Sequence, residues 1–409
     1  MIPARTSTVV AGVSIVTAGS MAANIASYLL HLPAGRVLGP QGYGVFASLL
    51  AAQLVLAVPA LALQTVVARD RVRGRSVAVS RRLGHLYAVV VAGLAVVATP
   101  VVAALLHTDV VTTAAAVVTA PFLVLLATEQ GLLQGDSRFG ALGGVLAASG
   151  LAKVVPAVTA LVLGGGVGPA LVAGAVGTAV MALAARIVVD RAEQTDEHDR
   201  PAAAGTWRDV LAASQVQLVI VALSSVDLLL ARRVLDPEAA GVYALGAVAA
   251  KAAFWLPQSV GVVLYPRMAD PRRSASAVRT ALLVLLGVGS VVVVGAAIVG
   301  PIVPLVMGAD YAPVQYLLWL FAAQGALLAV VQCGLLAAVA RGDTRSALAA
   351  WTVLLVEAVL VLTIVDSATE LVVVAAACAA VASVVVSTSA LGRVRVLGSV
   401  DDRIRGVGP

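Results

Sequence analysis

The sequence predicts an all-α integral membrane protein of about twelve transmembrane helices in two six-helix lobes. Its 409 residues are 61% hydrophobic and 12% charged, with a mean hydropathy of +1.02. So few charges cannot coat a water-soluble globule of this size. Apolar runs of roughly 20 residues, the length that crosses a bilayer, recur from Val9 to Leu391 with short polar breaks. The second half of the chain also repeats patterns of the first.

Glycine, proline and charged residues between the apolar runs mark the ends of the spans. The spans are expected at about 8–32, 43–68, 84–106, 110–133, 139–163, 167–189, 209–231, 241–266, 280–306, 313–340, 346–365 and 370–391. The first span lacks the short apolar core and cleavage site of a signal peptide, so we expect it to be retained. The predicted organisation is a first lobe at 1–189, a cytoplasmic linker at 190–208, a second lobe at 209–391 and a cytoplasmic tail at 392–409.

The basic residues alternate between rich and sparse loops. Of the 27, 22 are arginines in one set of loops, and the opposite set holds only Arg36, Arg232 and Arg233. The remaining two are lysines inside spans. Because cytoplasmic loops carry the excess of Lys and Arg, this alternation predicts that the N and C termini both lie in the cytoplasm.

Composition also excludes several other classes. The net charge is +6, but the basic residues are scattered over short loops without interleaved aromatic residues, which argues against a nucleic-acid partner. Cys333 and Cys378 fall inside apolar spans, where a thiol behaves as a small hydrophobe, so we expect no disulfide or metal site. The chain has no phosphate-binding Gly-x-x-x-x-Gly-Lys-[Ser/Thr] loop, and no cofactor is expected.

An internal duplication links the two halves. The segment from Arg36 to Ala47 returns 197 positions later, from Arg233 to Ala244, with seven of twelve residues identical. Other pairs follow at offsets of 197, 198 and 207: Thr17 and Ser214, Ser20 and Gln217, Ser27 and Ser224, Pro59 and Pro257, and the turns Gly-Asp-Ser-Arg at 135–138 and Gly-Asp-Thr-Arg at 342–345. Since six helices is an even number, the copies are predicted to be parallel repeats, with the substrate site between them near the midplane.

Polar side chains form a stripe on one face of the first span and recur on the seventh. We consider four of them substrate-binding candidates: Ser20, Asn24, Gln217 and Ser224. Alternatively, such residues only form hydrogen bonds with neighbouring helices.

Three local patterns resemble the polysaccharide flippases, of O-antigen and teichoic-acid type, of the multidrug/oligosaccharidyl-lipid/polysaccharide exporter superfamily. They are Arg-x-Leu-Gly-Pro-x-x-Tyr-Gly at 36–44, Leu-Gln-Gly-x-x-Arg-Phe at 133–139 and Gly-Ala-Asp-Tyr at 308–311. The resemblance implies two six-helix lobes around a cationic cavity, in the bacterial plasma (inner) membrane. It also implies that a lipid-linked glycan is the substrate, with membrane lipids and glycan-assembly enzymes as potential partners.

Five ionisable residues lie within spans, where each costs roughly 2.5 kcal/mol or more and is a functional candidate by default. Lys153 and Lys251 are the candidates for binding an anionic headgroup, and Glu357, Asp227 and Glu129 for ion coupling.

Structural alternatives remain for all five: Lys153 could have a structural role, and Glu129 could snorkel to the span end. Lys251 and Glu357 could form a buried pair that fixes helix packing. Asp227 could instead pair with Arg232 or Arg233.

Pro59 and Pro257 occupy matching places inside the second and eighth spans, where proline kinks a helix. They are hinge candidates, and a static kink is the alternative.

The function expected from these features is a secondary flippase that moves a lipid-linked oligosaccharide to the outer leaflet by alternating access. It is not expected to be an enzyme. The alternatives are a cation-coupled multidrug exporter of the same superfamily, a membrane-integral glycan-assembly enzyme and a non-transporting scaffold. Two midplane lysines against one glutamate argue mildly against the drug exporter.

Overall fold

The computed structural model describes residues 3–193, 215, 217–255, 274–340 and 345–405. These residues form helices and connecting turns, without a strand, which confirms the predicted all-α class. Nine helical stretches in this part of the chain are long and apolar enough to cross a membrane. The chain divides into two compact units, Met1–Leu218 and Val219–Pro409.

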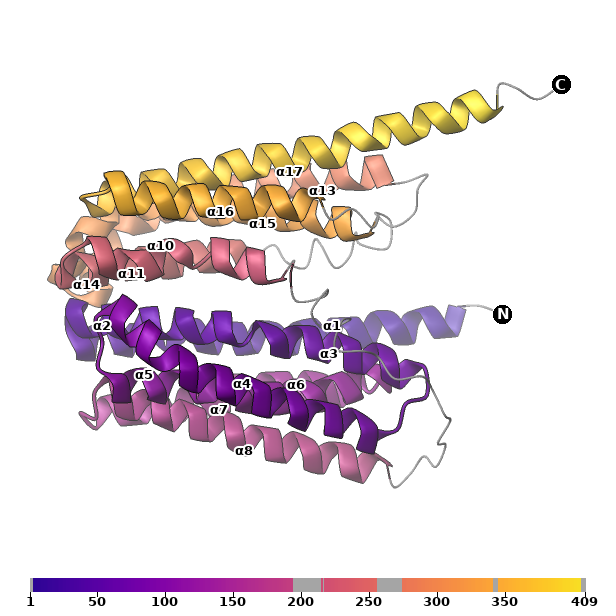
Figure 1. Cartoon of the computed structure of the whole chain (residues 1–409), viewed down its shortest axis with the longest axis horizontal. Helices are drawn as coiled ribbons and strands as arrows, with labels where there is room; N and C mark the ends of the chain where they lie inside the picture. Colours follow the sequence, from indigo (N-terminus) through magenta and orange to yellow (C-terminus); the bar gives the residue numbers. More distant parts are fainter. Residues whose placement is uncertain (1–2, 194–214, 216, 256–273, 341–344, 406–409) are drawn as a thin grey trace. The chain divides into compact units, whose positions relative to one another are not determined.

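The first unit contains eight helices that correspond to the first six predicted spans (Figure 1). They are α1 (Pro3–Leu29), α2 (His31–Leu56), α3 (Val58–Val72), α4 (Val77–Leu106), α5 (Val110–Val117), α6 (Thr119–Gly135), α7 (Phe139–Val162) and α8 (Val167–Glu193). The second span is interrupted at Ala57, two residues before Pro59, as a proline within the span predicts. Gly39 turns the chain inside α2 with φ 62°, a conformation that glycine adopts without strain.

The second unit begins at Val219, within a helical stretch at 217–223. It continues with α10 (Val226–Val234), α11 (Pro237–Trp255), α13 (Ser274–Val299), η1 (Gly300–Ile302), α14 (Val303–Met307), η2 (Ala309–Tyr316), α15 (Leu318–Ala340), α16 (Arg345–Ile364) and α17 (Ala368–Arg405). Pro257 lies outside the described residues. Of the predicted linker and tail, residues 190–193 continue α8 and residues 392–405 continue α17.

The two units pack their helices in the same order. In the first unit α7 packs on α1 and α8, and α6 packs on α3, α4 and α8. In the second unit α16 packs on α10 and α17, and α15 packs on α11, α13 and α17. Each pair in one unit has its counterpart at the same place in the other. This shared pattern supports the duplication predicted from sequence.

Small residues allow the closest helix contacts in the first unit. Gly143 of α7 packs on the backbone of α1, and a Cβ added at Gly19 would collide with the carbonyl group of Gly143. On the other side of α7, Gly177 of α8 has no room for a Cβ because the carbonyl group of Ala152 occupies that space. Helix association in lipid relies on such close packing, because lipid provides no hydrophobic drive between helices.

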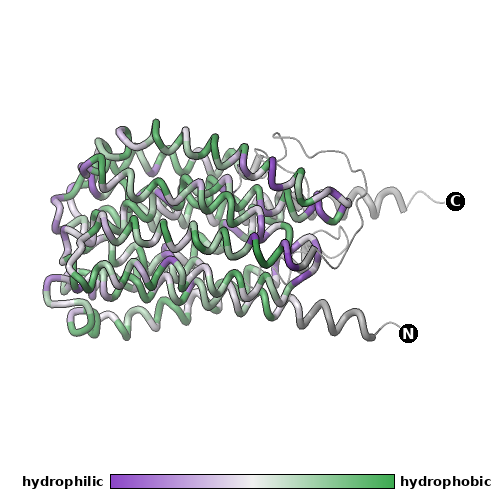
Figure 2. The backbone as a smooth tube through the Cα atoms, turned by 90° about the horizontal axis from the view of Figure 1, so that it is seen from below, coloured by the Kyte–Doolittle hydropathy of each residue, from purple (hydrophilic) through white to green (hydrophobic). Residues whose placement is uncertain are grey.

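The outward faces of the helices are apolar. Large side chains such as Val96, Leu183 and Leu355 are more than half exposed. Figure 2 shows hydrophobic residues along the lengths of the helices and hydrophilic residues concentrated toward their ends. This distribution matches a protein whose helices are solvated by lipid.

Candidate functional site

The seventh span is interrupted at Ser224 and Ser225. The helix that ends at Leu223 and the helix that begins at Val226 are separated by these two residues, and Ser225 has a non-helical φ of −138°. Interrupted helices at membrane depth occur where backbone lines a binding site or is enclosed by protein. Both serines are buried, at 7% and 0% exposure, so this break is enclosed by protein.

Asp227 follows the break and is almost completely buried. Its Oδ1 accepts a hydrogen bond from the backbone N–H of Leu228 at 2.7 Å. Its Oδ2 accepts two more, from the hydroxyl group of Tyr243 at 2.8 Å and from Nε2 of Gln324 at 2.9 Å. The carboxylate also lies in the first turn of α10, where the helix dipole favours negative charge. Hydrogen bonds from three helices therefore stabilise this charge in the membrane.

Glu357 of α16 provides a second buried carboxyl group, close enough to Asp227 for the two charges to interact. Its Oε1 is buried and has no hydrogen-bond partner in the described part of the chain, and the same holds for Oε1 of Gln324. Buried acceptors without partners are costly. Two carboxyl groups and an amide oxygen could hold a proton or a hard cation, which prefers oxygen ligands.

Lys251 completes the cluster from α11. Its Nζ donates a hydrogen bond to Oγ of Ser225 at 3.0 Å, and its charge also interacts with Asp227. Among the described residues Lys251 and Glu357 form no ion pair, so the paired arrangement considered from sequence is not formed. In the part of the chain that the structure describes, the carboxylate of Asp227 bonds to Leu228, Tyr243 and Gln324, and not to the arginines at 232 and 233.

The first unit carries apolar residues at the equivalent positions. The repeat offsets of 197 and 207 pair Asp227 with Leu30, Tyr243 with Phe46, and Glu357 with Gly150. Gly150 packs against the backbone of Ala23 in α1, a contact that leaves no space for a carboxyl group. The buried acidic cluster is therefore a feature of the second repeat.

Lys153 of α7 is half-buried, and its side chain packs over Gly174 of α8. Its ammonium group forms no hydrogen bond or ion pair with the residues that the structure describes. A lysine without a partner at membrane depth is energetically costly.

Glu129 of α6 belongs to a different cluster. Arg81 of α4 donates to both of its carboxylate oxygens, at 2.8 and 2.9 Å, and also bonds to Asp190 of α8 at 2.5 Å. The arginine thereby links three helices at the predicted cytoplasmic end of the first unit. Glu129 has a structural partner, which makes it the weakest of the three coupling candidates.

The four candidates of the polar stripe differ in burial. Ser224 is buried and donates to the backbone carbonyl of Val221 at 3.0 Å, so its hydroxyl group is satisfied within its own helix. Asn24 is exposed, and Ser20 and Gln217 are half-buried.

Sequence reasoning missed three members of the cluster around Asp227, namely Ser225, Tyr243 and Gln324. One signal was available for Tyr243. It replaces Phe46 within the repeated segment, and Asp227 replaces Leu30 just before it, so the two polar substitutions distinguish the copies together.

Solved structures with a similar fold are membrane transporters. An inward-facing multidrug resistance MATE family transporter of the MOP superfamily superposes with a TM-score of 0.69 at 11% identity, covering 93% of this chain and 96% of that chain. An outward-facing one gives 0.65 at 14% identity, covering 95% and 96%. The lipid II flippase MurJ, in an inward closed conformation, gives 0.63 at 12% identity, covering 92% and 88%.

The chain has the MOP-superfamily transporter fold. At these identities the likeness concerns the fold alone. No protein-family model matches the chain, and no curated protein matches it by sequence.

Proposed function

We propose that this MOP-fold protein is a secondary flippase that moves a lipid-linked oligosaccharide from the inner to the outer leaflet by alternating access. The observation that carries the proposal is Lys153, a half-buried cation at membrane depth that packs over Gly174 without an acidic partner among the described residues. A phosphate group that links sugar to lipid would compensate this charge. The fold shared with a lipid II flippase supports the same class of substrate.

The buried cluster of the second unit supports coupling to a cation or proton. Gln324 bonds to Asp227 beside a helix break, and Glu357 is a second buried carboxyl group whose charge interacts with Asp227. Oε1 of Gln324 and Oε1 of Glu357 lack hydrogen-bond partners in the described residues. In this proposal Tyr243 and Lys251 position the site. The hydroxyl group of Tyr243 orients the Asp227 carboxylate, and Lys251 holds Ser225 at the break.

Substitution of Lys153 tests the substrate assignment. In a deletion strain complemented with variants, K153A should abolish export of the glycan, whereas K153R should retain part of it because charge is the requirement. T159A, an exposed position on the same helix whose hydroxyl group bonds only within α7, is the matched control. Each variant is checked for expression and membrane insertion. Normal export by K153A would leave Lys153 with a packing role only.

Substitution of the buried carboxyl groups tests coupling. In proteoliposomes, D227N and E357Q should remove the response of transport to an imposed proton or sodium gradient, while exchange without a gradient continues. E238Q removes an exposed carboxylate from the first turn of α11 and should change nothing. A full gradient response in both D227N and E357Q would exclude the cluster as the coupling site.

A cation-coupled multidrug exporter is the second candidate, and the two buried carboxyl groups are the observation that favours it, together with the MATE-like fold. One comparison distinguishes the two functions. A flippase restores glycan export without changing drug tolerance, and an exporter raises tolerance to cationic drugs in a strain whose glycan is normal.

A further inference from the structure

The first unit contains a cavity of about 210 Å³ between α4, α6 and α8. It is built around Arg81, His85, Phe122, Glu129, Ala179 and Arg186. Exposed residues such as His85, Leu183 and Arg186 line it, so it opens on the outer surface of these helices. The cavity is separate from the Asp227 cluster, which belongs to the second unit.

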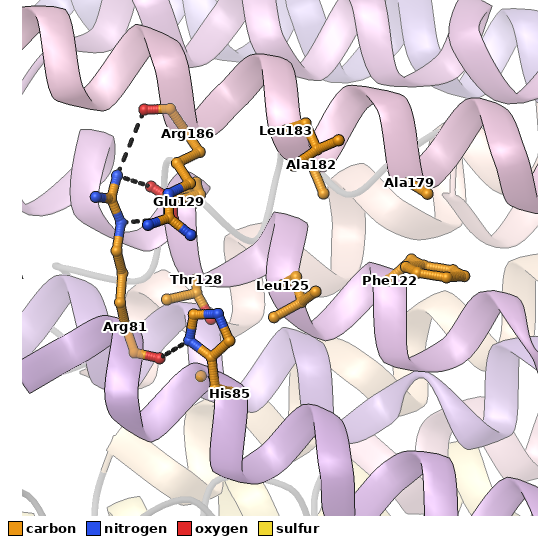
Figure 3. A pocket seen from close by; sticks show the side chains of 11 residues that line it. Arg81, His85, Phe122, Leu125, Thr128, Glu129, Ala179, Ala182, Leu183 and Arg186 are labelled. Carbon is orange, nitrogen blue, oxygen red and sulfur yellow. Dashed lines mark hydrogen bonds and ion pairs between the residues drawn. The ribbon is translucent and has the colours of Figure 1, made fainter. Parts of the chain in front are cut away.

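The lining changes from charged to apolar along the helix axes. Figure 3 shows Arg81, Glu129, Arg186 and His85 at one end of the cavity and Ala179 and Phe122 at the other. At 1.5 Å per residue, His85 lies about 12 Å from the start of α4, and Phe122 lies about 20 Å from the end of α6. Both of those helix ends are on the predicted cytoplasmic side. The cavity therefore extends from the depth of the headgroups into the hydrocarbon layer.

The charged end offers a free cation. The guanidinium group of Arg81 is committed to Glu129, Asp190 and the carbonyl oxygen of Arg186, so it neutralises the acidic side chains here. The Arg186 side chain, in contrast, is exposed and has no hydrogen-bond or ion-pair partner among the described residues. It can therefore receive an anion from outside the protein.

His85 provides a second group beside this arginine. Its Nδ1 lies 2.6 Å from the carbonyl oxygen of Arg81, which fixes the ring with Nδ1–H as donor. Nε2 is then an unprotonated acceptor, which can receive a donor group of a ligand but not a phosphate oxygen.

We propose that this cavity binds an anionic phospholipid of the cytoplasmic leaflet. The phosphate group bonds to Arg186, and one acyl chain lies along the apolar wall that Leu125, Leu183 and Phe122 form. Basic pockets between transmembrane helices on the cytoplasmic side suit such headgroups. A water-soluble anion would gain nothing from the apolar half, and a zwitterionic lipid, whose phosphate could also reach Arg186, would place its own cation beside the arginines.

Native mass spectrometry of the full-length protein, released from detergent with added phosphatidylglycerol or phosphatidylcholine, tests the proposal. The wild type should retain phosphatidylglycerol in preference to phosphatidylcholine. R186Q should weaken phosphatidylglycerol binding about fivefold, the effect of one basic residue near an anionic headgroup. R191Q removes the same charge from the same helix outside the cavity and should leave binding unchanged.

A second pair of variants tests the apolar wall. A179F fills the deep end of the cavity and should weaken phosphatidylglycerol binding, while V180F adds the same side chain at an exposed neighbour outside the cavity and should not. Equal losses in R186Q and R191Q, or unchanged binding in A179F, would overturn the proposal. Because the readout is lipid binding, its outcome is independent of whether the protein transports a glycan or a drug.

Discussion

Arg81 shows how this protein keeps charge inside a helix bundle. It lies one turn inside α4, is 13% exposed at its side chain, and is surrounded by two carboxylates from other helices. A buried ion pair adds little net stability over apolar residues, because both charges lose their hydration. Removal of Arg81, however, leaves the buried carboxylate of Glu129 without compensation, whereas removal of Glu129 leaves Arg81 with Asp190.

We predict that R81Q destabilises the protein by about 3 kcal/mol, since Glu129 would remain buried and charged. The midpoint of thermal unfolding in detergent measures the effect. E129Q should cost less, because Arg81 keeps Asp190 as a partner. The double variant should lose less stability than the sum of the losses in the two single variants, because the two residues interact directly.

Arg82 supplies the control for this pair. It is exposed and adjacent in sequence, so R82Q should leave the midpoint within about 0.5 kcal/mol of the wild type. If R81Q behaved like R82Q, the ion pairs of Arg81 would have no structural role.

At the scale of elements, glycines decide how closely the helices of the first unit approach. The backbones of α7 and α8 meet at Gly177 and Ala152, where even a methyl group would need the helices to separate. Gly144, on α7, has open space where its Cβ would be. The two positions therefore separate the effect of helix packing from the helix propensity of glycine.

G177A should destabilise the first unit by about 1–3 kcal/mol through overpacking. G144A should be neutral or stabilising, by up to about 1 kcal/mol, because alanine is the better helix former. Thermal unfolding of both variants in the same detergent gives the comparison. A stabilising G177A would mean that α7 and α8 do not approach as closely as the structure shows.

Asp109 caps α5 between two spans. Its carboxylate accepts from the backbone N–H of Thr112 at 2.8 Å, and hydrogen bonding to Thr112 lowers its pKa below the ordinary value. A lowered folded-state pKa means that the cap contributes fully above about pH 4 and is lost as the pH falls through that lowered pKa.

We therefore expect D109A to unfold at a lower temperature than the wild type at pH 6, and the difference to shrink as the pH falls below about 4. A difference that stayed constant over this range would show that the carboxylate charge is irrelevant to the cap.

At the scale of the whole molecule, the spans and the duplication could be predicted from the sequence. Span positions follow from local composition, and the repeat follows from a constant offset between similar segments. Neither prediction needs knowledge of which helices touch. The cluster around Asp227 was only partly predictable, because Tyr243 and Gln324 reach it from two other helices, 16 and 97 positions away. Glu129 was predicted as a functional charge, and its partner Arg81, 48 positions away, was missed for the same reason.

The orientation of the chain stays a prediction, and cysteine labelling tests it. In a background without Cys333 and Cys378, single cysteines at Ser76 and Ser399 should resist an impermeant thiol reagent in intact cells, because the arginine-rich loops are predicted to be cytoplasmic. A cysteine at Ala309 should react. Labelling at Ser76 together with protection at Ala309 would reverse the topology.

The break at Ser224 and Ser225 also has a consequence for isotope exchange. Continuous helices in lipid protect their amide protons, whereas amides after a break open at lower cost. In α10 the amides of Val226 and Asp227 precede the bond that Leu229 donates to Ser225. The matching residues of the first unit, Leu29 and Leu30, follow an unbroken helix, and the amide of Leu30 donates to the carbonyl group of Ala26. Deuterium uptake at Val226 and Asp227 should therefore exceed that at Leu29 and Leu30. It should fall when a cation occupies the Asp227 cluster, which makes these two amides a direct reporter of site occupancy without any transport assay.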